Sequence, residues 1–263
     1  MGERKMYHRG RRKKKKGGII STLILIIAIA VFCVSGYQLY KIFGGYHQGK
    51  SEYDKVREVA VHGDDKDEDE FVVDFDELKK INADTVGWIR FYPEPSQISY
   101  PLVQTTDNDL YLNRTFSANE NTVGAIFVNC DNASDFSDRN TIIYGHRMRD
   151  HSMFHDLEKY KDESFWKENP YFYIYTPDGR KLSCHIYSAG IVKDTSSTYL
   201  TQFASDEEYQ AFLDDTKRAG AYHTGVEVTT DQRVVTLSTC TAASDDNRMV
   251  VRGVIESEDV VKK

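Results

Sequence analysis

Residues 236–251 read TLSTC TAASDDN RMVV and carry more structural information than any other part of the chain. An apolar, β-branched run ends at Cys240, seven residues follow, and a second apolar run opens at Arg248. A connection this short makes the two runs antiparallel neighbours, which predicts Arg248 opposite Cys240. A third run, residues 140–146 (NTIIYGH), ends in His146. As neighbouring strands, the three runs would bring together the thiol, imidazole and guanidinium of a cysteine acyl-transfer site.

Short apolar, aromatic and β-branched runs recur from residue 86 onward and are separated by turns such as the Pro-Asp-Gly at 177–179. Strands this numerous and short favour an antiparallel sandwich or barrel. The sequence contains eight such runs, at residues 86–92, 98–104, 124–129, 141–146, 171–176, 181–192, 233–240 and 248–256.

Three further stretches have helical spacing. Residues 74–81 place acidic residues first and lysines last, as the helix dipole favours. Residues 152–160 and 206–219 interrupt the strands. Ser205 or Asp206 can cap the last helix, whose buried stripe would consist of Tyr209, Phe212 and Leu213. The predicted fold class is therefore mostly β with added helices.

Cys240 has two interpretations. An isolated cysteine is more often a buried structural residue than a nucleophile. The neighbouring hydroxyls of Thr236, Ser238 and Thr239, together with Arg248, favour the reactive interpretation, because a thiol reacts only where its surroundings activate it.

Arg252 and several histidines compete for the other two roles. Arg252 shares a face with Arg248 but lies roughly 13 Å farther along the strand, so we expect it to be solvated on the surface. A metal cluster of His146, His151 and His155 is disfavoured, because no Cys or Glu at zinc spacing joins it. His146 alone ends an apolar strand. The others, expected at the surface, are His151, His155, His185 and His223.

The N-terminus predicts a membrane anchor. Residues 1–16 carry nine Lys or Arg against one Glu, and residues 17–40 carry no charge. As a helix, the uncharged segment spans roughly 36 Å, enough for a hydrocarbon core of about 30 Å. The basic tail predicts a cytoplasmic N-terminus, with everything after Lys41 outside. A cleaved signal peptide is the alternative, but no clean cleavage site follows the apolar segment. The residues before Cys33 are a poor lipobox, because Phe32 occupies a position where a small residue is needed.

Residues 44–70 are polar and end in an acidic run that lacks the spacing of an EF-hand, so we expect a solvated spacer with a short helix at 52–61. The whole chain has 34 basic and 41 acidic residues, and removing the tail's nine and one leaves a net charge of about −15. Such a charge argues against a nucleic-acid partner.

The cysteines outside the anchor are too few for a domain built on disulfides. Cys130 and Cys184 either pair or, as we expect, remain free thiols.

Beyond these patterns, the chain resembles the class B sortases. TLxTC with a downstream arginine is specific to sortases, and the helix at 206–219 before the cysteine strand points to class B. The motifs that carry the resemblance are TLSTC (236–240) with Arg248, NTIIYGH (140–146), SMF (152–154), TVGWI (85–89), YPLVQ (100–104), and TDN (106–108) leading to YL (111–112).

The resemblance implies an eight-stranded sortase-type β-barrel with an N-terminal helix and a helix inserted before the cysteine strand, preceded by one transmembrane helix. It also implies a single-pass protein of the cell membrane with an extracellular catalytic domain. The expected parts are a basic cytoplasmic tail (1–16), a transmembrane helix (17–43), a polar linker (44–70), the catalytic domain (71–257) and a C-terminal tail (258–263).

The resemblance further implies a transpeptidase that cleaves a C-terminal sorting motif after its Thr through a thioester and transfers the acyl group to a cell-wall precursor amine. Cys240 would be the nucleophile, His146 the acid and then the base, and Arg248 the residue that holds substrate and oxyanion. The residues that match the family's substrate groove are Asn108, Leu112, Tyr199, Leu200 and Ser238. No cofactor and no metal are implied.

The implied partners are secreted proteins with a C-terminal sorting signal, a peptidoglycan precursor or other amine, and the membrane, without nucleic acid. Three alternatives keep the same fold. A pilin-polymerising sortase would use a substrate lysine as acceptor, and a cysteine peptidase would use water. A catalytically inactive wall-binding module would keep Cys240 as a structural residue.

Overall fold

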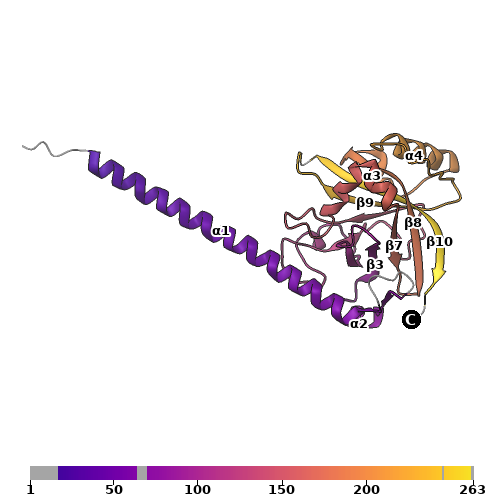
Figure 1. Ribbon diagram of the computed structural model, residues 1–263, viewed down its shortest axis with the longest axis horizontal. Coiled ribbons are helices and arrows are strands. Elements are labelled where there is room, and N and C mark those ends of the chain that lie inside the picture. The colour runs from indigo at the N-terminus through magenta and orange to yellow at the C-terminus, as the bar shows by residue number, and fades with distance from the viewer. Residues whose placement is uncertain (1–16, 64–69, 245, 262–263) are drawn as a thin grey trace, which may run out of the picture. The chain divides into compact units, whose positions relative to one another are not determined.

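The computed structural model describes residues 17–63, 70–244 and 246–261. It divides into two compact units, Met1–Gly44 and Gly45–Lys263. A single helix forms the described part of the first unit, and the barrel lies in the second (Figure 1). The basic tail predicted at residues 1–16 and most of the acidic run, 64–69, lie outside the described residues.

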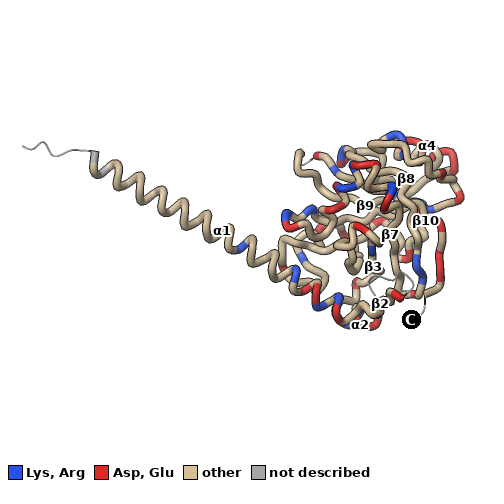
Figure 2. The backbone as a smooth tube through the Cα atoms, in the orientation of Figure 1, with Lys and Arg blue, Asp and Glu red and all other residues tan. Residues whose placement is uncertain are grey.

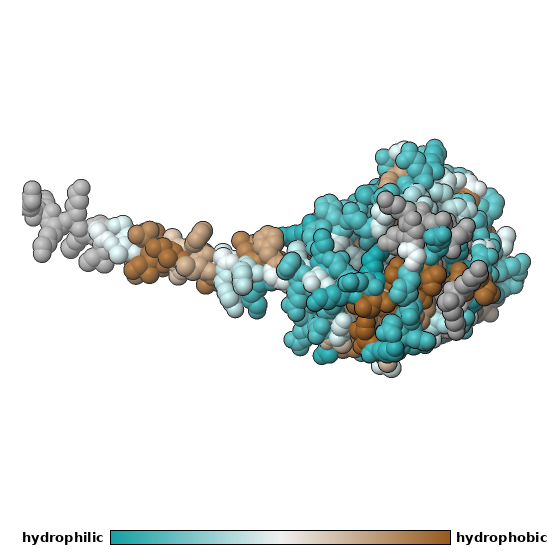
Figure 3. Space-filling view, turned by 60° about the horizontal axis from the view of Figure 1, so that its bottom comes forward, coloured by the Kyte–Doolittle hydropathy of each residue, from teal (hydrophilic) through white to brown (hydrophobic). Residues whose placement is uncertain are grey.

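Helix α1 (Gly17–Ala60) begins in the uncharged apolar segment. Within the described residues, it is the one helix long and apolar enough to cross a membrane. Residues 17–40 carry no charge, and Figure 2 shows the tube of α1 in tan over this N-terminal part. Figure 3 shows hydrophobic residues in brown over much of it, with paler stretches between them. Its length and composition fit the predicted anchor.

Residues 45–60 of α1 belong to the second unit and are not a solvated spacer. Tyr53, Val56 and Ala60 are buried in the core. Their spacing of three and four residues places them on one face of the helix, which explains why this polar segment packs. The prediction of a spacer at 44–70 was wrong for this part. After α1, β1 (Val61–His62) pairs antiparallel with β2 (Val72–Val73).

Helix α2 (Phe75–Ile81) forms as the charge pattern predicts. The Asp74 side chain caps it by accepting a hydrogen bond of 3.0 Å from the Glu77 N–H. Such a cap satisfies one of the donors that a helix N-terminus leaves open, and Leu78 turns into the core.

The remaining eight strands each coincide with one of the eight predicted runs, apart from small shifts at the ends. They are β3 (Thr85–Phe91), β4 (Ser99–Val103), β5 (Ile126–Val128), β6 (Asn140–Tyr144), β7 (Tyr171–Tyr175), β8 (Arg180–Lys193), β9 (Val234–Cys240) and β10 (Asn247–Val260). They close into a barrel in the order β10-β8-β7-β3-β4-β5-β6-β9. The eight-stranded, mostly β barrel is therefore confirmed.

Two neighbouring pairs, β4–β5 and β6–β9, are parallel, whereas we expected an antiparallel barrel. Long crossovers rather than hairpins connect the strands of these pairs, and a parallel pair needs such a crossover. The β6–β9 pair matters most for the site, because it places the strand that leads into His146 beside the strand that ends at Cys240.

Aromatic and aliphatic side chains fill the barrel. Phe91 of β3 pairs with Phe172 of β7, and their rings stack with centroids 5.3 Å apart. Both side chains are fully buried, and each such burial stabilises the fold by about 1.5–3 kcal/mol.

Short helices fill the connections between strands. The predicted helix at 206–219 forms as α4 (Asp206–Arg218), which is capped by Ser205 and buries Tyr209, Phe212 and Leu213. In the segment predicted as a helix at 152–160, the 3₁₀ helix η2 begins at His155 and ends at Lys161. These elements are η1 (Leu110–Leu112), η2 (His155–Lys161), α3 (Glu163–Glu168), η3 (Ser197–Tyr199) and α4 (Asp206–Arg218).

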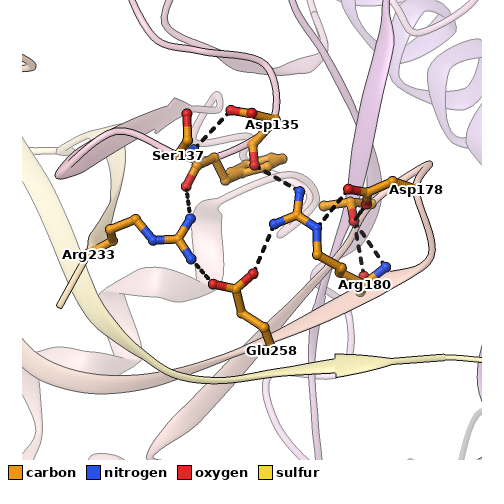
Figure 4. A network of polar contacts seen from close by, with 8 residues as sticks. Asp135, Ser137, Asp178, Arg180, Arg233 and Glu258 are labelled. Atoms are coloured by element: carbon orange, nitrogen blue, oxygen red, sulfur yellow. Dashed lines mark hydrogen bonds and ion pairs between the residues drawn. The ribbon is translucent and has the colours of Figure 1, made fainter.

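Strand β10 continues to Val260. The prediction of a C-terminal tail at 258–263 was therefore wrong for residues 258–260, which belong to the barrel. Its last residues pair with the start of β8. Figure 4 shows the polar network that holds this end: Glu258 forms ion pairs with Arg180, at 2.9 Å, and with Arg233.

Candidate active site

The register of β9 and β10 places Arg248 directly opposite Cys240, as the seven-residue connection predicts. Directly opposed residues of antiparallel strands have Cα atoms about 4.5–5.5 Å apart, so the two side chains start from neighbouring positions. Cys240 is exposed and Arg248 is half-buried. A thiol and a guanidinium therefore share one end of this strand pair.

Strand β6 brings His146 to the same end. It runs parallel to β9 with Tyr144 paired to Ser238, and the Gly145 N–H donates to the Ser238 carbonyl at 3.2 Å. Parallel strands end at the same edge of a sheet, so His146, one residue later, lies at the edge where Cys240 ends β9.

A pocket of about 230 Å³ opens between these strand ends. It brings together the three predicted catalytic residues and three of the five predicted groove residues. The lining residues are Asn108, Leu112, Phe127, Tyr144, Gly145, His146, Ser238, Thr239, Cys240 and Arg248.

A backbone carbonyl orients the imidazole of His146. Its Nε2 lies 2.6 Å from the Leu112 carbonyl oxygen. A carbonyl only accepts hydrogen bonds, so Nε2 carries a proton and Nδ1 is the nitrogen left to exchange one with a substrate. From the sequence, Leu112 is expected in substrate binding only; the role of its carbonyl is not predictable, because no side-chain pattern reveals a carbonyl partner.

Gly124 lies against the imidazole ring and was not among the predicted site residues. A Cβ added at Gly124 would come within 2.6 Å of His146 Cδ2 and 2.9 Å of the carbonyl oxygens of Tyr111 and Leu112. Its φ of +65° also favours glycine. The signal in the sequence is a glycine just before an apolar run, which indicates a turn or a close approach.

Phe154 holds the backbone around His146. The Phe154 N–H donates to the His146 carbonyl at 2.9 Å. A Cβ at Gly145 would lie 2.6 Å from the Phe154 ring, so only glycine fits there. The SMF segment therefore supports the histidine without lining the pocket.

Arg248 lies at the rim of the pocket. Its Nη2 is 3.9 Å from Asp194 Oδ2, and its Nη1 donates to the Asn247 carbonyl at 3.1 Å. Asp194 follows β8 and was not among the predicted site residues. Both side chains of this ion pair are partly exposed, so water weakens it.

Arg252 is fully buried, and the prediction that it is solvated was wrong. Its Nη2 donates to Thr198 Oγ1 at 2.7 Å and its Nη1 to Ser188 Oγ at 3.0 Å. Elements η3 and α4 cover this face of β10, which the local sequence does not reveal. Burial lowers the pKa of Arg252.

Tyr199 lies beside the pocket and contacts two residues that line it. Its hydroxyl and Ser238 Oγ are 2.9 Å apart, and its ring stacks on Tyr144 with centroids 6.2 Å apart. Burial raises the pKa of Tyr199, so its phenol stays protonated. Leu200 follows with an exposed side chain, outside the pocket lining.

Asn140 ties the cysteine strand to the segment that carries Tyr199 and Leu200. Its Oδ1 accepts from Thr236 Oγ1 at 2.8 Å, and its Nδ2 donates to the Leu200 carbonyl at 2.8 Å. The buried hydroxyl of Thr236 is thus a positioning group. Part of the hydroxyl-rich sequence before Cys240 therefore has a structural role, whereas we expected these hydroxyls to favour a reactive thiol.

The cysteines are free thiols in different surroundings. Burial raises the pKa of Cys184, which lies in the core. Partial burial and the charge of Asp131 raise the pKa of Cys130, whose backbone N–H donates to Asn108 Oδ1 at 2.9 Å. Cys240 combines exposure with the pocket that holds His146.

His151, His155 and Asp156 form the set nearest to a metal site in the described part of the chain, and His146 is not in it. Their ligand atoms lie within 4.8 Å of one another, and His151 Nδ1 is 3.6 Å from Asp156 Oδ1. Lys159 also pairs with Asp156 at 2.9 Å.

Comparison with known proteins identifies the family that the sequence motifs resemble, the sortases. The family model described as "Sortase domain" matches residues 94–256. Sortase B of Listeria monocytogenes is 32% identical over 240 residues, covering 87% of this chain and 93% of that protein. A Staphylococcus aureus sortase B–substrate complex superposes with a TM-score of 0.65 at 35% identity, covering 72% of this chain and 85% of that one. A sortase B complexed with triglycine has the same TM-score and identity, covering 72% and 86%.

Proposed function

The chain belongs to the sortases, in class B, and on that premise we propose that Cys240, His146 and Arg248 catalyse transfer of secreted proteins to an amine of the cell wall. The observation that carries the proposal is the strand register, which sets Arg248 opposite Cys240 at the edge where β6 leads into His146. Nucleophile, proton carrier and oxyanion partner then border one pocket.

The first half-reaction is acyl transfer to sulfur. The Cys240 thiolate attacks the carbonyl carbon of the Thr in the sorting motif, and the guanidinium of Arg248 stabilises the oxyanion. The carbon–nitrogen bond then breaks, and His146 protonates the departing amine. A thioester on Cys240 and a free peptide amine result.

The second half-reaction reverses these steps with a new amine. The acceptor nitrogen attacks the thioester, neutral His146 takes its proton, and the Cys240 thiolate leaves. The hydrogen bond from Nε2 to the Leu112 carbonyl supports Nδ1 as the nitrogen that carries the proton in both halves. The rate should be bell-shaped in pH, because the reaction begins from a thiolate beside an imidazolium.

The substrate would lie along Asn108, Leu112, Tyr199, Leu200 and Ser238. Three of these residues line the pocket, and Tyr199 is bonded to one of them. The substrate complex of the S. aureus sortase B supports a sorting signal as donor, and the triglycine complex supports a glycine-type amine as acceptor.

The α1 segment at residues 17–43 would anchor the enzyme as a single-pass protein of the cell membrane. Its apolar composition and the basic residues before it support a cytoplasmic N-terminus and an extracellular barrel. This orientation would place the pocket where secreted proteins and cell-wall precursors meet.

Incubating the purified chain with peptides that contain Pro and Thr in a five-residue motif, with and without triglycine, tests the proposal by mass spectrometry. We expect cleavage after Thr and a triglycine adduct as the main product. A lysine peptide in place of triglycine distinguishes pilin polymerisation. Hydrolysis alone would indicate a peptidase, and no cleavage by a folded protein would indicate an inactive module; either result would contradict the proposal.

A further inference from the structure

The second unit's part of α1, residues 45–60, holds the loop between η1 and β5, residues 113–125. The Asn121 side chain donates to the Gly45 carbonyl at 3.0 Å. The Glu52 carboxylate accepts from the Ser117 N–H and from the Asn119 side chain, both at 3.0 Å. These contacts fix the loop along one side of the helix.

Tyr53 is hydrogen-bonded to two backbone groups of this loop. Its hydroxyl donates to the Gly124 carbonyl at 2.7 Å and accepts from the Phe116 N–H at 3.2 Å. Its ring lies edge-on to Tyr100, with centroids 5.3 Å apart. Burial raises the pKa of Tyr53 well above its ordinary value, so the phenol remains a donor throughout the working pH range.

The same loop also lies against His146. Gly124, whose carbonyl binds Tyr53, lies so close to the imidazole that an added Cβ would be 2.6 Å from Cδ2. The Leu112 carbonyl, just before the loop, binds Nε2. The Ala125 N–H donates to the Tyr111 carbonyl at 2.9 Å, which joins the two ends of the loop beside the ring.

We propose that Tyr53 is a positioning residue for His146: by tying Phe116 to Gly124, its hydroxyl keeps the loop pressed against the imidazole and in register with the Leu112 carbonyl. This inference rests on the proposed role of His146. Tyr53 is not among the residues that line the pocket, so we infer that it acts through Gly124. A shift of the ring by about 1 Å is enough to slow proton transfer substantially, because the reacting groups then lose alignment.

The two hydrogen bonds of Tyr53 satisfy buried backbone groups that have few alternatives. Removing the hydroxyl leaves the Gly124 carbonyl and the Phe116 N–H to find other partners, which favours movement of the loop. The ring of a phenylalanine would still fill the space. Tyr53→Phe therefore removes the tie and keeps the packing.

The test compares Tyr53→Phe with Tyr160→Phe in the full-length chain in detergent. Tyr160 is a matched control, because it is also buried and its hydroxyl donates to a backbone carbonyl, that of Asn169, at 2.8 Å. For Tyr53→Phe we expect kcat to fall about 5- to 20-fold with KM within about twofold of the original. Tyr160→Phe should lose stability without this fall in kcat.

A spectroscopic readout separates this proposal from the proposed function. In ¹⁵N-histidine-labelled protein, the Nε2 proton of His146 should give a protected, low-field signal that broadens or exchanges faster in Tyr53→Phe and not in Tyr160→Phe. Because this signal needs no substrate, it tests positioning even if no transfer is detected.

Equal kcat values and equal His146 signals in the two variants would overturn the positioning role. If Tyr53→Phe fails to fold, Glu52→Ala provides the second variant, since it loosens the same loop from a half-buried site. An unchanged His146 signal in Glu52→Ala would then overturn the proposal.

Discussion

The cysteine side and the histidine side of the pocket are built in different ways. On the cysteine side, one hairpin is enough: the β9–β10 register alone sets Arg248 opposite Cys240. On the histidine side, the imidazole depends on segments far apart in the chain. The Leu112 carbonyl binds it, Gly124 packs against it, and Tyr53 of α1 holds Gly124.

The comparison teaches that two things are determined separately: which reactive groups are present in the pocket, and how well they are aligned. A hairpin fixes which groups meet, so changes on the cysteine side should remove a chemical role outright. Loop and helix packing fixes how well the histidine is aimed, so changes there should lower the rate in graded steps. Four predictions test this contrast.

Loss of the nucleophile should have the largest effect. We expect Cys240→Ala to lower peptide cleavage by about 10⁴-fold or more, because no other group forms the thioester. Cys130→Ala is the matched control and should keep full activity, since partial burial and Asp131 raise the pKa of that thiol. Chromatographic product assays measure both. Equal losses in the two variants would break the assignment of the nucleophile.

Substitution of the two arginines of β10 should affect two different properties: catalytic rate for Arg248 and stability for Arg252. Arg248→Lys should lower kcat/KM about 10²- to 10³-fold at unchanged stability, because lysine lacks the planar donor fork. Arg252→Lys should lower the free energy of unfolding by about 2–3 kcal/mol, because the buried bonds to Thr198 and Ser188 are lost. Urea unfolding and initial rates measure the pair. An exchange of the two phenotypes would show that the roles are reversed.

An added methyl group tests the histidine side. Gly124→Ala should lower kcat about 10- to 100-fold, because the new Cβ would displace the imidazole from alignment. Gly225→Ala controls for backbone strain, since its φ is +76° but a Cβ there meets nothing within 4 Å. Steady-state rates and melting curves of both variants separate strain from displacement. A Gly124→Ala enzyme as active as Gly225→Ala would show that the ring contact is unimportant.

The smallest effect should come from the carboxylate of α1 that holds the same loop. Burial raises the pKa of Glu52, but hydrogen bonds from Thr115, Asn119 and Ser117 outweigh it and hold the pKa below the ordinary value of 4.5. Its stabilisation is therefore complete above that pH and is lost as the pH falls through the lowered pKa.

Wild type should be more stable than Glu52→Gln near neutral pH by less than about 1 kcal/mol, because water screens a half-exposed carboxylate. The difference should shrink as the pH falls below 4.5. Melting temperatures across this range measure it. A difference that grows on acidification would contradict the assigned direction of the shift.

The sequence predicts the cysteine side well because its determinants are local. The eight strands follow from short apolar runs, and the opposition of Cys240 and Arg248 follows from a seven-residue connection. His146 is predictable as the residue after an apolar strand. Its position beside Cys240 then follows if β6 and β9 are neighbours, as they are.

The remaining parts were not predictable because they depend on packing between distant segments. Arg252 follows the same strand pattern as Arg248, and only the cover of η3 and α4 distinguishes them. Residues 45–60 look like a polar spacer until the barrel supplies a surface for Tyr53, Val56 and Ala60. The Leu112 carbonyl carries no signature at all, since every residue has one.

Intact-mass spectrometry of the enzyme, quenched in acid during turnover with a sorting peptide, tests the central claim most directly. We predict an adduct equal to the peptide through its Thr, mapped to Cys240, that accumulates without amine and disappears when triglycine is added. An adduct on Cys130, or cleavage with no adduct and no response to triglycine, would contradict the account.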